Sequence, residues 1–160
     1  MCSAALDLQE LKLGEPLRPV CSSCSHVIYH GPKLAAGTVF SYDGGVLLAR
    51  RGISPCKGKW VFPGGFVDWG ELVIDAAIRE TREEVDVEVS VHSLLDVYSY
   101  PSAPVVVIAY AATLISGTPR AADETLEVKS FAPGEIPWEE LAFSSTRDAV
   151  STYIHRFHKK

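Results

Sequence analysis

The feature that most constrains this chain is a set of acidic residues whose spacing fits one face of a helix. Glu80, Glu83 and Glu84 stand at positions i, i+3 and i+4. Residues with this spacing project from the same side of an α-helix, and each uncompensated pair of like charges there costs roughly 0.2–0.5 kcal/mol. A positive group is therefore expected beside them. A hard divalent cation suits an all-carboxylate cluster best.

Glycines just before this helix favour a ligand site over a plain salt-bridged surface. For the acidic spacing taken by itself, the alternative is a solvated face on which Arg79 and Arg82 neutralise the glutamates. Gly64 and Gly65, however, form a turn ahead of the helix. Glycine lets a backbone carbonyl or amide approach a ligand closely, and a helix N-terminus attracts anions such as phosphate. The sequence therefore indicates a cation and a phosphate at one place.

The order of these residues resembles the signature of the Nudix hydrolase family. That signature runs glycine, five residues, glutamate, seven residues, then Arg-Glu-aliphatic-x-Glu-Glu-x-Gly-aliphatic. Here Gly65 and Glu71 have the same separation, and R-E-T-R-E-E-V-D-V follows from Arg79. Thr81 replaces the aliphatic residue, and Asp86 replaces the glycine where the family's helix ends. If residue 86 is left-handed, Asp tolerates that conformation better than most residues but less well than Gly.

The resemblance implies an α/β fold, the Nudix α/β/α sandwich with a mixed β-sheet between helices. It also implies a metal-dependent hydrolase that uses Mg²⁺ or Mn²⁺. The implied metal ligands are Glu80, Glu83, Glu84 and the carbonyl of Gly64. Arg79 would orient the acids by bidentate pairing, and Glu71 would support the turn or the helix start. Arg51, at a predicted strand end, is a candidate to meet the substrate phosphates, with an ordinary surface charge as the alternative.

The expected reaction is hydrolysis of the pyrophosphate bond of a nucleoside diphosphate linked to another moiety, with release of a nucleoside monophosphate. The stretch Glu135–Trp138, followed by residues 141–145, looks like the close of Nudix enzymes that carry a zinc ribbon and cleave FAD or ADP-ribose. The general base is either a glutamate of the signature helix or one of Glu124 and Glu127, and Glu127 is interpreted as a strand residue. A non-catalytic nucleotide-binding sensor is the alternative function, which loss of a glutamate would favour.

Aromatic side chains that could stack on an adenine or flavin form a separate group of candidates. They are Phe66, Trp69, Tyr98 and Tyr100. Packing in the core or in a loop is the alternative for each of them.

Residues 1–33 are predicted to be an N-terminal extension, and residues 34–160 the Nudix domain. Cys21 and Cys24 form a C-x-x-C pair that looks like one knuckle of a zinc ribbon, and Cys2 falls where a cysteine of the other knuckle would lie. The ribbon looks truncated. Zinc held by these three cysteines and a histidine is left open. A metal-free arm packed on the domain is the favoured interpretation.

The rest of the chain reads as short strands and helices. We expect a hairpin over residues 37–49, a short strand at 60–62, a helix from Glu71 to Val85, one or two strands within 86–100, a central strand over 103–115 and a strand over 126–131. A short helix at Trp138–Leu141 precedes a last helix to about His158. Ser145 and Asp148 predict a capping box for that last helix.

Length and charge limit the class of protein. A chain of 160 residues fits one domain with a sizeable core, and a net charge of −5 argues against a nucleic-acid-binding surface. The longest apolar run, residues 104–115, is too short to span a bilayer, and the first residues do not resemble a secretory signal. We expect a cytoplasmic enzyme that acts on a small-molecule nucleotide and has no membrane partner. A homodimer is left open.

Overall fold

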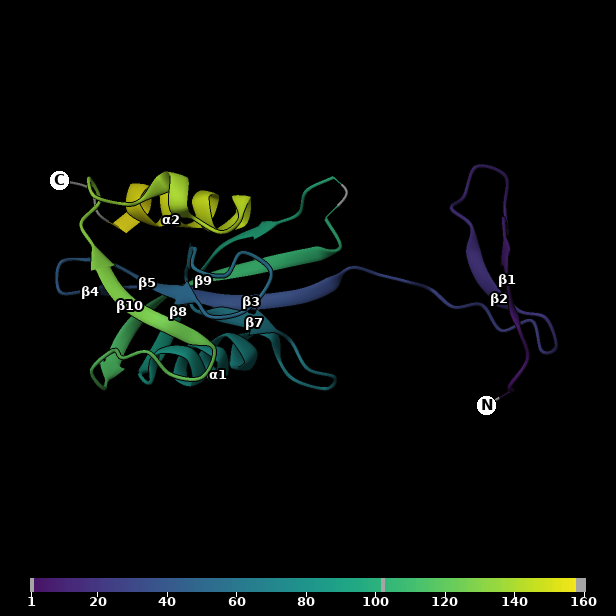
Figure 1. Cartoon of the computed structure of the whole chain (residues 1–160), viewed down its shortest axis with the longest axis horizontal. Coiled ribbons are helices and arrows are strands. Elements are labelled where there is room, and N and C mark those ends of the chain that lie inside the picture. Colours follow the sequence, from purple (N-terminus) through teal and green to yellow (C-terminus); the bar gives the residue numbers. More distant parts are fainter. Residues whose placement is uncertain (1, 102, 158–160) are drawn as a thin grey trace. The chain divides into compact units, whose positions relative to one another are not determined.

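The structure is a computed structural model that describes residues 2–101 and 103–157. It divides into two compact units, Met1–Pro32 and Lys33–Lys160. Figure 1 shows the helices and strands of both units. Each unit is described by itself below.

The N-terminal unit is built on a two-stranded antiparallel sheet. Strand β1 (Leu6–Gln9) pairs with β2 (Arg18–Cys21), and Leu6 lies opposite Cys21. All four residues of β1 are exposed. Among the described residues of this unit, only Val20 and Cys21 are buried. The sheet therefore has almost no apolar core beneath it.

A mixed four-stranded sheet forms the centre of the second unit, in the order β7-β3-β9-β8. Its strands are β3 (Lys33–Val39), β7 (Gly64–Phe66), β8 (Glu88–Tyr98) and β9 (Val105–Ser116). β3 runs parallel to β9, whereas β7 and β8 are antiparallel to their neighbours. β9 has a strand on each side, which confirms the central strand predicted over residues 103–115. Its long apolar run suits this position, because a parallel-paired strand is normally covered on both faces.

A second sheet has the order β10-β5-β4, and β6 also pairs with β5. These strands are β4 (Ser41–Tyr42), β5 (Gly45–Arg51), β6 (Trp60–Val61) and β10 (Thr125–Phe131). The hairpin predicted over residues 37–49 is only partly correct. Ser41 and Tyr42 pair with β5, but the residues up to Val39 belong to β3 in the other sheet. The chain changes sheets at the fully buried Phe40, because β3 takes β9 as its partner.

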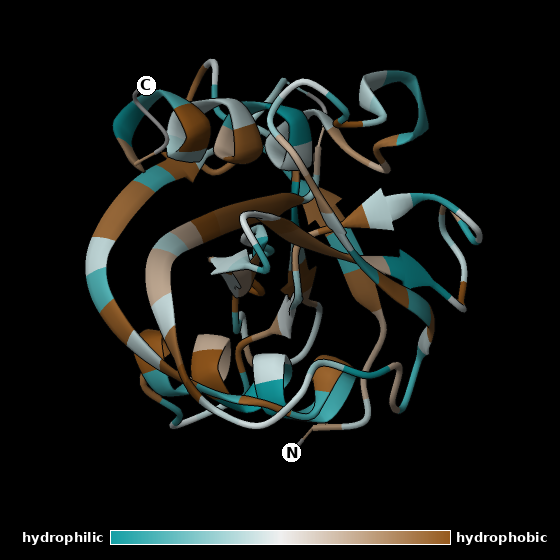
Figure 2. Ribbon diagram, turned by 90° about the vertical axis from the view of Figure 1, so that its left-hand side faces the viewer, coloured by the Kyte–Doolittle hydropathy of each residue, from teal (hydrophilic) through white to brown (hydrophobic). Residues whose placement is uncertain are grey.

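Helices lie on both sides of the sheets, which confirms the predicted α/β/α sandwich. In Figure 1, α1 (Val73–Val85) and α2 (Ser144–Phe157) lie on opposite sides of the strands. A short 3₁₀ helix (Trp138–Glu140) precedes α2, close to its predicted place. Figure 2 shows the central strands as largely hydrophobic, with polar and apolar residues alternating along the helices. Among the described residues, no helix is long and apolar enough to cross a membrane.

Two main apolar clusters hold the helices against the sheets. One joins Ala149, Val150 and Tyr153 of α2 to strand residues that include Val39 and Leu48. The other joins the last turn of α1 to both sheets through Val85, Val87, Phe40 and Leu47. Burial of a side chain of this size stabilises the fold by roughly 1.5–3 kcal/mol. The end of α1 is therefore fixed more firmly than an exposed helix end would be.

Three local predictions about helix ends have different outcomes. α1 begins at Val73 instead of Glu71, because Gly70 is left-handed and the N–H of Glu71 donates to the carbonyl of Asp68 in a turn. At the other end, Asp86 is left-handed with φ 55°, as the helix stop requires.

The capping box predicted for α2 is wrong. The helix begins at Ser144, so the buried Ser145 already lies in its first turn. Asp148 instead accepts a hydrogen bond of 2.6 Å from the hydroxyl of Tyr100. The predicted end at His158 lies outside the described residues.

Candidate active site

The glycine turn of β7 lies directly against α1. The N–H of Gly64 donates to Oε2 of Glu84 at 3.0 Å. A Cβ on Gly65 would overlap the carboxylate of Glu80, and a Cβ on Gly64 would overlap the carbonyl oxygen of Ala36 on β3. Position 64 therefore requires glycine, because the backbone of β3 leaves no room for a side chain there, whereas a side chain at residue 65 would displace the Glu80 carboxylate. The turn brings the N–H of Gly64 and two carboxylates into one place.

The guanidinium of Arg79 forms hydrogen bonds with several acids at this site. It makes a bidentate pair with Glu71, with Nε–Oε1 2.8 Å and Nη2–Oε2 3.0 Å. Its Nη1 donates to Glu80 at 2.7 Å and to Glu83 at 2.9 Å. Nη2 also donates to the carbonyl of Phe66 at 3.1 Å. One guanidinium thus ties three acids to the strand before the helix, a task that its rigid fork of donors can perform.

The predicted role of Arg79 as an orienting residue agrees with these contacts. Glu71 is reached both by Arg79 and by the N–H of Asp68 at 3.1 Å, which agrees with its predicted support of the turn. Arg82 does not take part, because it pairs with Glu88 at 2.7 Å.

The acids of this face differ in the direction in which their pKa values are shifted. Hydrogen bonds from Arg79 lower the pKa of Glu71 to about 2. The same hydrogen bonds raise the pKa of the Arg79 guanidinium. Burial raises the pKa of Glu80, although Arg79 opposes the shift. Burial also raises the pKa of Glu84 to about 7, because one N–H from Gly64 offsets little of the lost hydration.

Glu84 also lines a small pocket that extends the site. Arg51 and Glu124 line the same pocket, together with apolar residues and Thr125. Nε of Arg51 donates to the carbonyl of Pro55 at 2.8 Å. The guanidinium of Arg51 also lies 5.2 Å from the ring centroid of Phe143. The structure therefore brings together Arg51, Glu84 and the loop candidate Glu124, all of which the sequence proposed for the site.

Main-chain hydrogen bonds to the end of α1 hold the loop that carries Glu124. The carbonyl of Glu84 accepts from the N–H of Ala122, and the carbonyl of Val85 accepts from the N–H of Arg120, both at 3.1 Å. The carbonyl of Glu124 accepts from the N–H of Gly52 at 2.7 Å. These contacts satisfy helix carbonyls that have no partner within the helix.

Glu127, the other loop candidate, lies outside this pocket. It belongs to β10 and pairs with Arg50 at 3.3 Å, so its interpretation as a strand residue is correct.

The aromatic candidates also separate into two groups. Tyr98 is buried, and the hydroxyls of Tyr98 and Tyr100 bond to residues of α2. Phe66 and Trp69 are exposed. Phe66 and Trp69 are therefore the candidates most accessible to a ligand from solvent.

Thr38 is a contributor that sequence reasoning missed. Its hydroxyl lies 2.7 Å from that of Thr81, which donates to the carbonyl of Ala77. Both threonines are fully buried. The pair joins α1 to β3 by a polar contact where the signature has an aliphatic residue. The only available signal was that departure at Thr81, and it could not identify the partner.

The donor set fits a hard divalent cation. Glu80, Glu83 and Glu84 offer carboxylates and Gly64 offers a carbonyl, the oxygen ligands that Mg²⁺ and Mn²⁺ prefer. In the structure, Glu80 and Glu83 turn toward Arg79 and Glu84 turns toward Gly64. The raised pKa values of Glu80 and Glu84 show that internal donors leave these two charges incompletely compensated. A cation at this place would provide the missing compensation.

Comparison with known proteins places this site in a wider group. The NUDIX domain family matches residues 31–152. An ADP-ribose pyrophosphatase from Methanocaldococcus jannaschii is 36% identical over 120 residues, covering 72% of this chain and 70% of that protein. A NUDIX hydrolase from Nitrosomonas europaea has a TM-score of 0.90 at 32% identity, covering 98% of this chain and 89% of its own. A MutT NUDIX hydrolase from Burkholderia pseudomallei has a TM-score of 0.68 at 31% identity, covering 76% and 97%.

Proposed function

This chain belongs to the Nudix family and is a Nudix-type pyrophosphohydrolase, and from this premise we propose that its substrate is a nucleoside diphosphate linked to a second moiety, of the ADP-ribose or FAD class. Hydrolysis of the pyrophosphate bond would release a nucleoside monophosphate. One observation carries the proposal: every acid of the signature is present and gathered around Arg79 and the glycine turn. The name of the Methanocaldococcus jannaschii relative favours ADP-ribose as the first substrate to test.

We assign the metal-holding role to Glu80, Glu83, Glu84 and the carbonyl of Gly64. A bound Mg²⁺ or Mn²⁺ ion would supply an activated water and charge pairing with phosphoryl oxygens. Arg79 keeps the acids oriented by the hydrogen bonds described above, and Glu71 keeps Arg79 in place. With the acids held in advance, little reorganisation is needed when the polyanionic substrate arrives.

The pocket beside Glu84 supplies the remaining groups. Arg51 would bind a substrate phosphate there, because it is the arginine that lines the pocket. Glu124 would accept a proton from the attacking water, whose oxygen forms the new bond to phosphorus while the bond to the bridging oxygen breaks. The leaving phosphate takes the bridging oxygen with it. General-base catalysis of this kind contributes roughly 10²–10⁴-fold in rate.

A substrate panel tests the proposal. Purified protein would be incubated with ADP-ribose, FAD, NADH and nucleoside triphosphates, with and without Mg²⁺ or Mn²⁺, and products would be separated by chromatography. We expect metal-dependent release of AMP from ADP-ribose or FAD. Glu83→Gln should abolish most turnover while the fold survives, and Glu127→Gln, outside the pocket, serves as the matched control. Preference for nucleoside triphosphates would overturn the substrate class, and binding without hydrolysis would favour a sensor module.

A further inference from the structure

Arg51 and Arg79 use their side-chain donors in different ways. Arg79 donates to protein acceptors from Nε and from both terminal nitrogens. Nε of Arg51 donates to the carbonyl of Pro55 at 2.8 Å. The two terminal nitrogens of Arg51 make no hydrogen bond or ion pair with the part of the chain that the structure describes. Because a guanidinium has only donors, both of these nitrogens remain available to an acceptor on a ligand.

An aromatic ring supports the face of the Arg51 guanidinium. Cζ of Arg51 lies over the ring of Phe143, 5.2 Å from its centroid. Phe143 is half-buried and immediately precedes α2. A guanidinium is attracted to the face of a ring at this distance, and stacking leaves the N–H groups at its edge unused. The ring and the hydrogen bond at Nε therefore restrain Arg51 together without occupying its terminal donors.

The loop that supplies the Pro55 carbonyl is itself held by hydrogen bonds. The N–H of Arg51 donates to the carbonyl of Lys59 at 2.9 Å, and the N–H of Gly58 donates to the carbonyl of Arg51 at 2.8 Å. Nε of Arg50 also donates to the carbonyl of Gly58 at 2.8 Å. The loop is thus closed at its base, so the acceptor for Nε of Arg51 has a fixed place.

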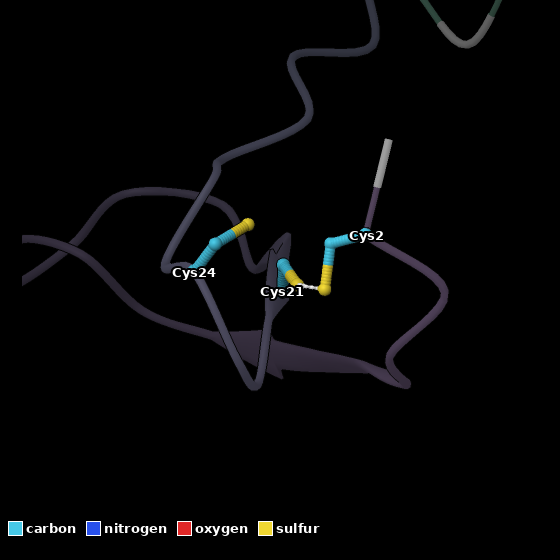
Figure 3. A group of neighbouring side chains, drawn as sticks. All are labelled: Cys2, Cys21 and Cys24. Atoms are coloured by element: carbon cyan, nitrogen blue, oxygen red, sulfur yellow. Dashed lines mark hydrogen bonds between the residues drawn. The ribbon is translucent and has the colours of Figure 1, made fainter.

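A thiol joins this loop to the segment that carries Phe143. Three of the four cysteines gather in the N-terminal unit, with their Sγ atoms within 4.8 Å of one another; these are Cys2, Cys21 and Cys24 (Figure 3). The remaining one, Cys56, belongs to the other unit, and its Sγ donates to the carbonyl of Ala142 at 3.4 Å. The residue before Phe143 is therefore bonded directly to the loop after Arg51.

The same segment is also bonded to β6. The N–H of Ala142 donates to the carbonyl of Trp60 at 2.8 Å, and Leu141 forms a parallel bridge with Trp60. β6 in turn pairs with β5, whose last residue is Arg51. The ring of Phe143 and the guanidinium of Arg51 therefore meet within one hydrogen-bonded framework.

The charges of the pocket explain why Arg51 needs this support. Glu84 and Glu124 line the pocket, and among its described lining residues Arg51 carries the only positive charge. A free guanidinium beside two carboxylates is drawn toward them, because opposite charges attract strongly where water is partly excluded. In the described chain, no ion pair joins Arg51 to either acid. The arginine is thus held apart from acids that would otherwise take its donors.

We propose that Phe143 is a positioning residue for the hydrolysis. Its ring holds the guanidinium of Arg51 where the two terminal nitrogens can bind a substrate phosphate, and it keeps the side chain from turning onto Glu84 or Glu124. The proposal rests on the phosphate-binding role proposed above for Arg51, and it gives Phe143 no contact with the substrate. Leucine at this position would fill part of the space but has no π face, whereas tyrosine would keep the ring.

Steady-state kinetics of two substitutions at residue 143 provide the test. For Phe143→Leu we expect the KM for ADP-ribose to rise about fivefold and kcat to stay within about twofold, because phosphate binding is lost equally in the ground state and the transition state. Phe143→Tyr should stay within about twofold of the unmodified protein in both constants. Phe157→Leu is the matched control, because Phe157 packs against Tyr153 and His92 at the end of α2. Its KM should not change, even where its free energy of unfolding falls as much as that of Phe143→Leu.

A double substitution separates positioning from packing. Arg51→Ala should raise KM by about tenfold or more, because a charge-assisted hydrogen bond to the substrate is lost. Adding Phe143→Leu to Arg51→Ala should raise KM no further, because the ring then has no guanidinium to hold. Calorimetric titration of the same proteins with ADP-ribose in a chelator measures binding without turnover, and Kd should follow the same pattern.

An equal rise in KM for Phe143→Leu with and without Arg51 would overturn the proposal. An unchanged KM for Phe143→Leu, or a rise as large for Phe143→Tyr, would do the same. If Arg51→Ala itself leaves KM unchanged, Arg51 does not bind the phosphate, and the roles of both residues fail. If another nucleotide is preferred, the proposed substrate class fails, while the same pattern measured on that nucleotide would support the role of Phe143.

Discussion

The two ends of the acidic face on α1 differ in how their charge is compensated. Toward the start of α1, Arg79 donates to Glu71, Glu80 and Glu83. At the other end, Glu84 has a single N–H donor from Gly64, and burial raises its pKa to about 7. One end carries its own cation, whereas the other is buried with little compensation.

This difference separates the part of the site that is complete in the folded chain from the part that needs a ligand. Arg79 lowers the pKa of Glu71, so the charged form of that acid is favoured and contributes to stability. A buried acid that is poorly compensated costs stability until a cation arrives. We therefore expect substitutions of Arg79 and Glu71 to change mainly the stability of the protein, and substitution of Glu84 to change mainly its chemistry.

The largest effect is expected for Glu84→Gln, measured as metal-dependent turnover. We expect activity to fall by more than about 10³-fold, because losing a metal ligand removes both charge stabilisation and activation of water. In a chelator, the free energy of unfolding should stay level or rise, since the amide has no charge to desolvate. A parallel fall in stability without metal would show that Glu84 is mainly structural and would remove the contrast.

Glu124→Gln tests whether the pocket beside Glu84 takes part in the reaction. We expect kcat to fall by about 10²-fold with little change in stability, because the side chain would act as a base. Glu127→Gln is the matched control, since that residue pairs with Arg50 outside the pocket. Equal activity of the two variants would remove Glu124 from the chemistry.

Arg79→Lys tests the compensated end. Lysine keeps the charge but cannot form a bidentate pair with Glu71 while also reaching two other acids. Hydrogen bonds to charged groups are worth about 1.5–3 kcal/mol, so we expect the free energy of unfolding to fall by about 2 kcal/mol. Arg82→Lys is the control, because Arg82 and Glu88 form an exposed pair and its loss should cost less than about 1 kcal/mol. Denaturant midpoints of both variants give the comparison.

Acid titration tests how much the pairing of Glu71 with Arg79 contributes to stability. Arg79 lowers the pKa of Glu71 from 4.5 to about 2. A lowered carboxyl pKa stabilises the fold fully above the unfolded value, and this stability is lost as the pH falls through the folded value. The stability difference between the unmodified protein and Glu71→Gln should therefore be constant above pH about 5 and shrink toward pH about 2. A difference that stays constant across this range, in thermal unfolding, would contradict the pairing.

The smallest effect is expected at Asp86, where α1 ends. Asp86→Gly removes left-handed strain, for a gain of about 0.5–1 kcal/mol. The variant also loses a pair between Asp86 and Arg120 at 2.5 Å, which is exposed and worth little. We expect a net rise of about 0.5 kcal/mol in the free energy of unfolding. Asp86→Asn, which tolerates the conformation but lacks the charge, should be slightly less stable than the unmodified protein. A lower midpoint for Asp86→Gly would show that the ion pair outweighs the strain.

The predictions that succeeded depend on local spacing. The i, i+3 and i+4 glutamates share a face on any helix, and the helix end at Asp86 is implied by the resemblance to the Nudix signature, which has a glycine at that position. The apolar run before Ser116 predicts a central strand, because a long apolar run suits a strand that has a partner on each side.

Most of the predictions that failed depend on distant partners. The hairpin was extended too far because β3 pairs with β9, far along the chain. The helix start moved for a local reason, because Gly70 is left-handed and Glu71 lies in a turn with Asp68. The capping box failed because Tyr100 takes the carboxylate of Asp148. Glu124 was one of two loop candidates, and its place beside Glu84 depends on main-chain contacts that no residue type reveals.

Those main-chain contacts also limit how this enzyme can be redesigned. The peptide groups of Arg120 and Ala122 complete the final turn of α1, so the segment 117–125 is joined to the catalytic helix whatever its side chains are. A grafted segment of different length would leave two helix carbonyls without donors and would move Glu84 itself. Side chains along this segment, Glu124 among them, are therefore better targets for substitution than its length or those two amides.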